Sequence, residues 1–152
     1  PGNASTVLQQ AGALVMNCRE VFVLGKIRGT SPEHIGEQAR SKLVDAMKSG
    51  RWLHMDMLNT TPAIGEFCSD ECFPGDAVLS PKFGQRVELH EKIVKDEEKD
   101  SDAWVPRGDW KEKGHGVIVT TQLSPEDYRE FLSSAWPEFP FDSMKEIIVK
   151  AL

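Results

Sequence analysis

The pattern of apolar and polar positions between Glu20 and Asn59 predicts a strand, a helix and a second strand. Val21 to Leu24 and Trp52 to Asp56 are short apolar runs of the length of buried strands. Between them, Ser31-Pro32-Glu33 is a typical helix start, and Gly50 is a typical helix end. Two short strands joined by a helix form a βαβ unit, so we expect parallel neighbours.

The rest of the chain adds further elements of the same kind. Asn3 or Ser5 can cap a first helix, and its apolar face would consist of Val7, Ala11, Leu14, Val15 and Cys18. His115 to Thr121 predicts a strand, Ser124 a helix start, and Ile147 to Val149 a final strand. The expected fold is therefore α/β, with three layers: a mostly parallel sheet of about four strands with helices on both faces.

We expect one domain over residues 1–152, with an irregular loop region at 60–114 that is rich in proline and glycine. Within it, Lys95 to Asp102 is almost wholly charged and predicts an exposed connection. On the helix that starts at Ser31, the charged side chains, Arg40 among them, are expected to face water.

Composition narrows the classes of partner. The net charge of −6 argues against nucleic acid and against an anionic membrane surface. We therefore expect a protein partner, no nucleic acid and no membrane. Three cysteines suit a reducing compartment, so we expect a cytoplasmic protein. The chain begins at Pro1 rather than Met, which is typical of a processed or an excised piece.

The first candidate for chemistry is the glycine-containing stretch from Gly25 to Ser31. A glycine loop between a strand and a helix start presents backbone N–H groups to phosphate. Gly25, Lys26, Gly29, Thr30 and Ser31 are then the candidate phosphate contacts. The stretch departs from the pattern G-x-x-x-x-G-K-[ST], because Lys26 comes too early. The alternative is an ordinary connection between a strand and a helix.

Asp56 is the candidate metal ligand. It follows four largely apolar residues at the carboxyl end of a predicted strand, where ligands of parallel sheets gather. This is the arrangement of a Walker-B magnesium ligand, although Met57 follows where an ATPase places a catalytic glutamate. The alternative is an aspartate that caps the end of the strand.

A family resemblance rests on two stretches. Residues 36–58, with the pattern A-x-x-x-G-x-W followed by an apolar strand, resemble the helix and Walker-B strand of AAA+ ATPases of the dynein type. Val117 to Thr121 is similar to that family's next strand, which ends in a polar sensor residue. The resemblance implies ATP or ADP with Mg²⁺ as ligand, Asp56 near the metal, and Thr120 or Thr121 near a γ-phosphate.

The chain also departs from that family. It shows no Walker A motif, no glutamate after Asp56 and no identifiable arginine finger. The resemblance therefore implies a divergent or inactive member, a pseudo-ATPase module that acts through protein contacts.

Two further functions remain open. His54 and Asp56 lie two residues apart on a predicted strand, so their side chains share a face and could form the general base of a small hydrolase. The tryptophan-rich loop at 104–110 could instead anchor a protein partner in a pure interaction module with no ligand.

The cysteines do not favour zinc. Cys68 and Cys72 form a single C-x₃-C pair, and His90 lies eighteen residues further on. A structural zinc site needs four ligands, usually from two close pairs.

Overall fold

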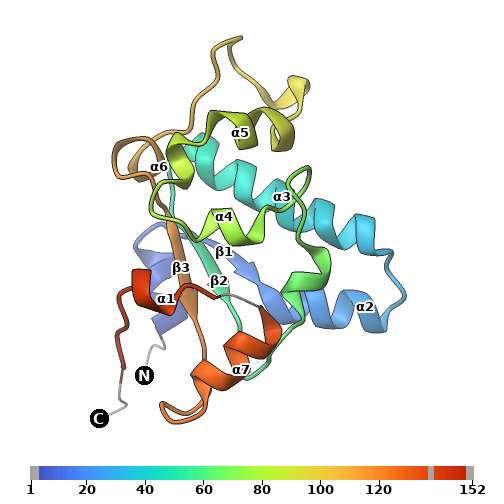
Figure 1. The fold of residues 1–152 in the computed structure, drawn as a ribbon, viewed down its shortest axis with the longest axis vertical. Helices are drawn as coiled ribbons and strands as arrows, with labels where there is room; N and C mark the ends of the chain where they lie inside the picture. The colour runs from blue at the N-terminus through green and yellow to red at the C-terminus, as the bar shows by residue number, and fades with distance from the viewer. Residues whose placement is uncertain (1–3, 137–138, 150–152) are drawn as a thin grey trace.

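The computed structural model describes residues 4–136 and 139–149. Within that part of the chain, a parallel sheet of three strands lies in the order β1-β2-β3 (Figure 1). The strands are β1 (Leu14–Asn17), β2 (Leu53–Asp56) and β3 (Val117–Thr120). Helices surround this sheet, so the predicted α/β class is confirmed.

The connections between strands are mostly helical. The α-helices are α1 (Ala4–Gln10), α2 (Gly25–Ile27), α3 (Pro32–Ser49), α4 (Gly75–Val78), α5 (Val87–Ile93), α6 (Asp109–Glu112) and α7 (Tyr128–Ala135). The chain also forms one π-helical segment and short 3₁₀ turns, at Arg19–Leu24, Ile64–Phe67, Phe83–Gln85, Asp96–Glu98 and Phe141–Ser143. Over the described residues, none of the helices has the length and apolar character needed to cross a membrane.

Helix α3 forms where the sequence predicts it. The Ser31 hydroxyl accepts a hydrogen bond from the His34 amide, and Pro32 occupies the first turn. Gly50 ends the helix in the left-handed conformation, with φ of 69°. One face of α3 is fully buried and joins the hydrophobic core, through Ile35, Ala39, Leu43, Ala46 and Met47. Both ends of the helix and its buried stripe are therefore confirmed.

The two faces of the sheet differ in chemistry. All four residues of β2 are buried, which requires cover on both faces. Leu53 and Met55 join the hydrophobic core that includes the buried stripe of α3. His54 and Asp56 point to the opposite face, where Ser5 of α1 reaches Asp56; in Figure 1, α1 passes behind β3.

The first predicted strand is wrong. Val21 to Leu24 lies in the π-helical segment, and the strand is formed by Leu14–Asn17 instead. Both stretches are short apolar runs, and periodicity alone does not separate a buried strand from a buried helical turn. Leu14–Asn17 pairs in register with β2, from Leu14 beside Leu53 to Asn17 beside Asp56. The βαβ prediction therefore holds for the topology but not for the residues of its first strand.

Both ends of the chain also differ from expectation. The first helix ends at Gln10, and Gly12 (φ 95°) turns the chain before β1, so Leu14 and Val15 are strand residues. Ile147 to Val149 has the composition of a strand but adopts no regular structure and is exposed. This leaves three strands in the described sheet, where the sequence suggested about four.

Arg40 is buried, contrary to the prediction of a water-facing side chain. It bonds the carboxylates of Glu37 and Glu98, at 2.7 to 2.8 Å. Glu98 belongs to the charged stretch Lys95 to Asp102, so this network fixes part of that stretch to α3.

Candidate functional site

The carboxyl ends of the three strands carry a row of polar side chains. Asn17, Asp56 and Thr120 occupy the last paired positions of β1, β2 and β3 and are matched in register. Matched positions of parallel strands share a face, so the three side chains lie in a row. Ligands of parallel α/β proteins bind at this edge.

Asp56 stands at the centre of this row and is almost fully buried, with 7% of its surface exposed. One carboxylate oxygen accepts a hydrogen bond from the Ser5 hydroxyl at 2.7 Å. The other accepts from the Thr120 hydroxyl at 3.1 Å and from the Leu58 amide at 3.2 Å. Asp56 thus joins α1, β2 and β3, and two hydroxyl groups lie beside a carboxylate.

His54 extends this network behind Thr120. Its Nε2 lies 2.7 Å from the Thr120 hydroxyl oxygen. Because that hydroxyl donates its single proton to Asp56, Nε2 must carry a proton and donate to Thr120. Burial lowers the pKa of His54, with the Asp56 charge acting against it, so the neutral ring is favoured. The other ring nitrogen, Nδ1, is buried and has no hydrogen-bond partner among the described residues.

The predicted shared face of His54 and Asp56 is confirmed, but its hydrolase geometry is not formed. The hydrogen bonds connect the two side chains through Thr120, rather than directly. In a nucleophilic triad the histidine lies between the hydroxyl and the carboxylate. Here the Ser5 hydroxyl bonds to the carboxylate itself, so Asp56 does not orient His54 toward a nucleophile.

The stretch from Gly25 to Ser31 does not form the expected phosphate loop. It is not preceded by a strand, and Gly25 lies in helical conformation (φ −55°) against Ile35. Lys26 forms an exposed ion pair with Glu66 at 2.7 Å. Gly29 has a positive φ of 75°, the Thr30 amide donates to the Gly25 carbonyl at 3.0 Å, and Ser31 caps α3. These residues build a helix-to-helix connection, because the apolar run before them is helical.

Thr120 and Thr121 make different contacts and have different roles. Thr120 lies in the polar row, as described above. The Thr121 hydroxyl donates to the Leu58 carbonyl at 3.4 Å and accepts from the Leu123 amide at 3.1 Å, so it shapes the loop after β3. Of the residues selected from sequence, the structure therefore brings together His54, Asp56 and Thr120.

Sequence reasoning missed Ser5, which bonds to Asp56, and Asn17, which ends β1 beside Asp56 and accepts a hydrogen bond from the Glu20 amide. Ser5 was expected only as a helix cap, and Asn17 was expected at no site. The usable signal was the polar residue directly after an apolar run: Leu14-Val15-Met16-Asn17 has the same form as Leu53 to Asp56. Ser5 carries no such signal, since its contact with Asp56 spans 51 positions in the chain.

The cysteines and histidines stay apart. The Cys68 thiol donates to the Ile64 carbonyl at 3.3 Å, and burial raises the pKa of Cys72. His90 lies against Phe83 and bonds its carbonyl at 2.9 Å. Among the described residues, no group of three or more histidine, cysteine, aspartate or glutamate side chains could hold a metal ion.

The tryptophan side chains of the loop at 104–110 pack against the hydrophobic core rather than facing solvent. Trp110 is fully buried, and its ring N–H donates to the Arg51 carbonyl at 2.7 Å. Trp104 is half-buried against His90. The prediction that Trp110 anchors a partner from this loop therefore does not fit its burial.

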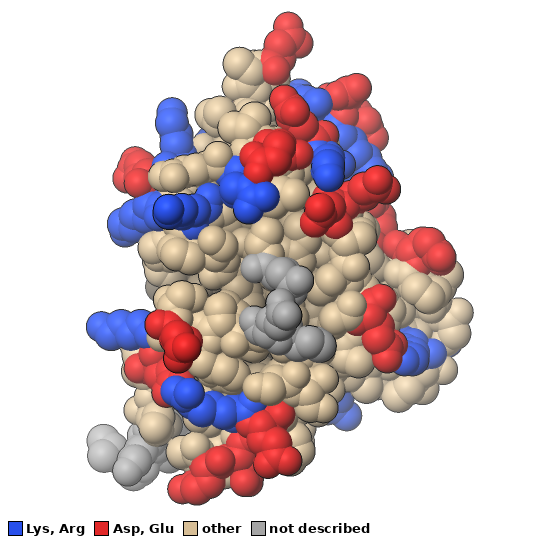
Figure 2. All heavy atoms as spheres, in the orientation of Figure 1, with Lys and Arg blue, Asp and Glu red and all other residues tan. Residues whose placement is uncertain are grey.

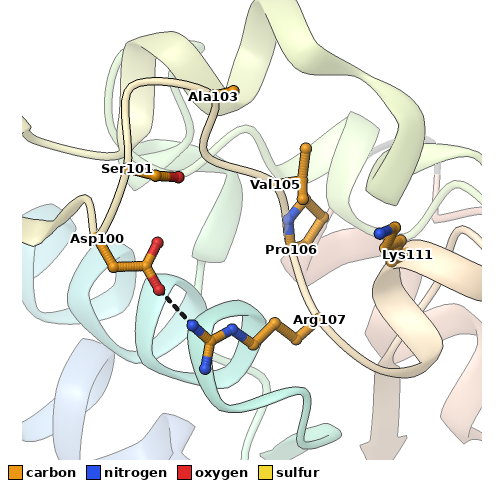
Figure 3. Close-up of a pocket in the computed structure, with 7 residues that line it drawn as sticks. All are labelled: Asp100, Ser101, Ala103, Val105, Pro106, Arg107 and Lys111. Carbon is orange, nitrogen blue, oxygen red and sulfur yellow. Dashed lines mark hydrogen bonds and ion pairs between the residues drawn. The ribbon is translucent and has the colours of Figure 1, made fainter.

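A shallow pocket of about 370 Å³ opens on the same loop (Figure 3). Arg107 points across it to Asp100, with which it forms an ion pair, and Lys111 stands on the far side. This pocket lies at the amino end of the sheet, because the loop contacts Gly50 just before β2. It is therefore separate from the row around Asp56.

Charged side chains of both signs lie near one another on the face of the molecule drawn in Figure 2. Figure 2 shows acidic and basic side chains side by side around α5 and the loop that follows it. Several of them form ion pairs, including Lys95 with Glu37 and Lys99 with Asp96.

Comparison with protein-family models, with curated proteins and with solved structures finds no match for this chain.

Proposed function

We propose that this chain is a divergent nucleotide-binding module that holds the Mg²⁺ of a bound nucleotide between Ser5 and Asp56. The observation that carries the proposal is the 2.7 Å contact between the Ser5 hydroxyl and the Asp56 carboxylate, at the carboxyl edge of a parallel sheet. In P-loop NTPases, Mg²⁺ is held by a serine or threonine hydroxyl and an aspartate at the end of a strand. Ser5 and Asp56 supply these two groups.

The donor set suits magnesium. Mg²⁺ prefers oxygen ligands and is usually bound through one or two carboxylates together with the phosphates of its nucleotide. One carboxylate, two neighbouring hydroxyls and a nucleotide satisfy that preference without a cluster of protein ligands. Thr120, held in place by His54, would keep its hydroxyl on Asp56 and so would orient the carboxylate that binds the metal.

The residue that follows Asp56 favours nucleotide binding over nucleotide hydrolysis. Hydrolysis needs a group that positions the attacking water. Met57, the residue after Asp56, is apolar and fully buried. We therefore expect the module to bind nucleotide with little hydrolysis and to act through protein contacts.

Isothermal titration calorimetry tests this directly. The wild-type chain should bind ADP or ATP in the presence of Mg²⁺ and lose most of that affinity when EDTA removes the metal. Asp56→Asn keeps the side-chain shape and should abolish the magnesium-dependent part. Asp45→Asn, an exposed carboxylate on α3, is the matched control and should bind like the wild type.

The Lys26→Ala variant distinguishes the phosphate loop predicted at Gly25 to Ser31 from the proposed site around Asp56. Because Lys26 pairs with Glu66 on the surface, we expect nucleotide affinity to stay unchanged in this variant. Failure of the wild type to bind either nucleotide, or equal binding by Asp56→Asn and Asp45→Asn, would refute the proposal.

A further inference from the structure

The C-terminal segment displays three consecutive apolar side chains to water. Ile147, Ile148 and Val149 are 76%, 60% and 71% exposed. The chain is already extended at Met144, and Glu146 is tied to α7 through an ion pair with Arg129. Ile147 to Val149 lie outside every regular element, and their β-branched composition is that of a strand, although none of the described strands pairs with them.

The sheet offers a matching free edge. The carbonyls of Gly116 and Thr120 accept hydrogen bonds from Leu53 and Met57, so those residues face β2. Alternation along a strand then turns the N–H and C=O groups of Val117 and Val119 outward. The hydrogen bonds of the described chain leave these outward groups without a partner. β3 is therefore an edge strand that can accept another strand.

This edge lacks the features that normally prevent strand addition. Natural edge strands carry lysine, proline or a bulge, whereas residues 117–122 contain no charged residue and no proline. Val117 and Val119 pack on the core with partial exposure. A strand with β-branched side chains would extend this apolar surface through cross-strand pairs.

We infer that Ile147 to Val149 of one copy adds as a strand to the β3 edge of a second copy, and that the exchange is reciprocal. Each chain contains both the uncharged segment that would be added, Ile147 to Val149, and the uncharged edge that would accept it, β3. In Figure 1 the C-terminal segment descends on the β3 side of the sheet. Reciprocal exchange buries both copies' exposed apolar segments in a closed two-fold dimer. This inference does not depend on the proposed nucleotide site.

Sedimentation of the intact chain, with and without nucleotide, tests the inference. The wild-type mass should rise from one chain toward two as the concentration increases. Ile148→Lys places a charge in the added strand and should keep the chain monomeric. Ile27→Lys is the matched control: Ile27 is 74% exposed on α2, so this variant should associate like the wild type.

A second variant tests the accepting edge. Val117→Pro removes an outward N–H at the first position of β3, where proline is tolerated. It should be monomeric while it still unfolds in a single cooperative transition, which shows that the variant is folded. In the wild-type dimer, the Val119 amide should exchange its hydrogen more slowly than in the Ile148→Lys monomer.

Each remaining outcome overturns the inference. A wild-type chain that stays monomeric at all concentrations excludes a second copy as the occupant of the edge. Equal loss of association in Ile27→Lys and Ile148→Lys would show non-specific apolar contact. A folded Val117→Pro variant that still dimerises would show that β3 is not the accepting edge.

Discussion

Replacing Arg40 by methionine should destabilise the fold strongly, although sequence alone places this residue in water. Arg40 is 3% exposed, and four of its hydrogen bonds reach the carboxylates of Glu37 and Glu98. It also donates to the Ile93 carbonyl. Arg40→Met keeps the apolar stem of the side chain and removes the charge, so the variant isolates the ion network.

The magnitude follows from what the substitution leaves behind. Removing one partner of a buried ion pair costs about 3–5 kcal/mol, because the other charge remains unpaired. The side chains of Glu98 and Glu37 are 24% and 39% exposed, so water can partly solvate the carboxylates that lose their partner. We therefore expect the lower end, about 3 kcal/mol, which lowers the unfolding midpoint by roughly 6–12 °C in a chain of this size.

The effect should also depend on pH. Hydrogen bonds from Arg40 lower the pKa of Glu37 to about 2 and also lower the pKa of Glu98. A carboxyl group whose folded pKa lies below its unfolded value, about 4.3, stabilises the fold above that value. That stabilisation is lost as the pH falls toward 2. The difference between wild type and Arg40→Met should therefore shrink over the same range.

Chemical denaturation from pH 7 down to pH 3 measures both effects. Lys42→Met, which removes an exposed charge from the same helix, is the control and should change the free energy of unfolding by less than about 0.5 kcal/mol. A destabilisation by Arg40→Met no larger than the control, or one that does not change with pH, would refute the role assigned to the network.

Other predictions concern packing and a buried histidine. Gly84→Ala should lower the free energy of unfolding by about 3 kcal/mol or more, because its Cβ would lie 1.6 Å from the Trp110 carbonyl oxygen. Gly29→Ala has open space around it and should lower the free energy of unfolding by only about 1–2 kcal/mol, through its positive φ. Trp110→Phe should cost about 2 kcal/mol by leaving the Arg51 carbonyl unpaired. Denaturant titrations measure all three. Burial lowers the pKa of His90, so its contribution to stability is complete above about pH 6.5 and is lost as the pH falls; His90→Gln should flatten that part of the profile.

The sequence predicts the fold where local and tertiary preferences agree. Helix α3 has a serine cap, an N-terminal proline, a glycine end and a helical apolar stripe, and it forms as expected. Leu14 to Asn17 and Val21 to Leu24 carry no such signals, and both are short apolar runs. Only pairing with β2 decides that the first becomes the strand, and this pairing is a property of the whole fold.

The candidate site also contains some residues that a local sequence pattern predicts and others that it does not. Asp56 and Thr120 are recognisable because each ends an apolar strand. Ser5 reaches Asp56 across 51 positions, and Arg40 reaches Glu98 across 58. No local pattern encodes contacts of this kind, so a polar residue that joins distant elements looks like any surface residue in the sequence.

The central claim is that Asp56 binds nucleotide through magnesium, and thermal unfolding tests it most directly. A ligand at 100 times its Kd adds about 2.7 kcal/mol to the stability of the native state, which corresponds to roughly 5–11 °C for a chain of this size. We predict a shift of this order with millimolar ATP or ADP and Mg²⁺, and its loss in Asp56→Asn relative to that variant's own ligand-free midpoint. An unchanged wild-type midpoint with both nucleotides, or an equal shift in Asp56→Asn, would contradict the account.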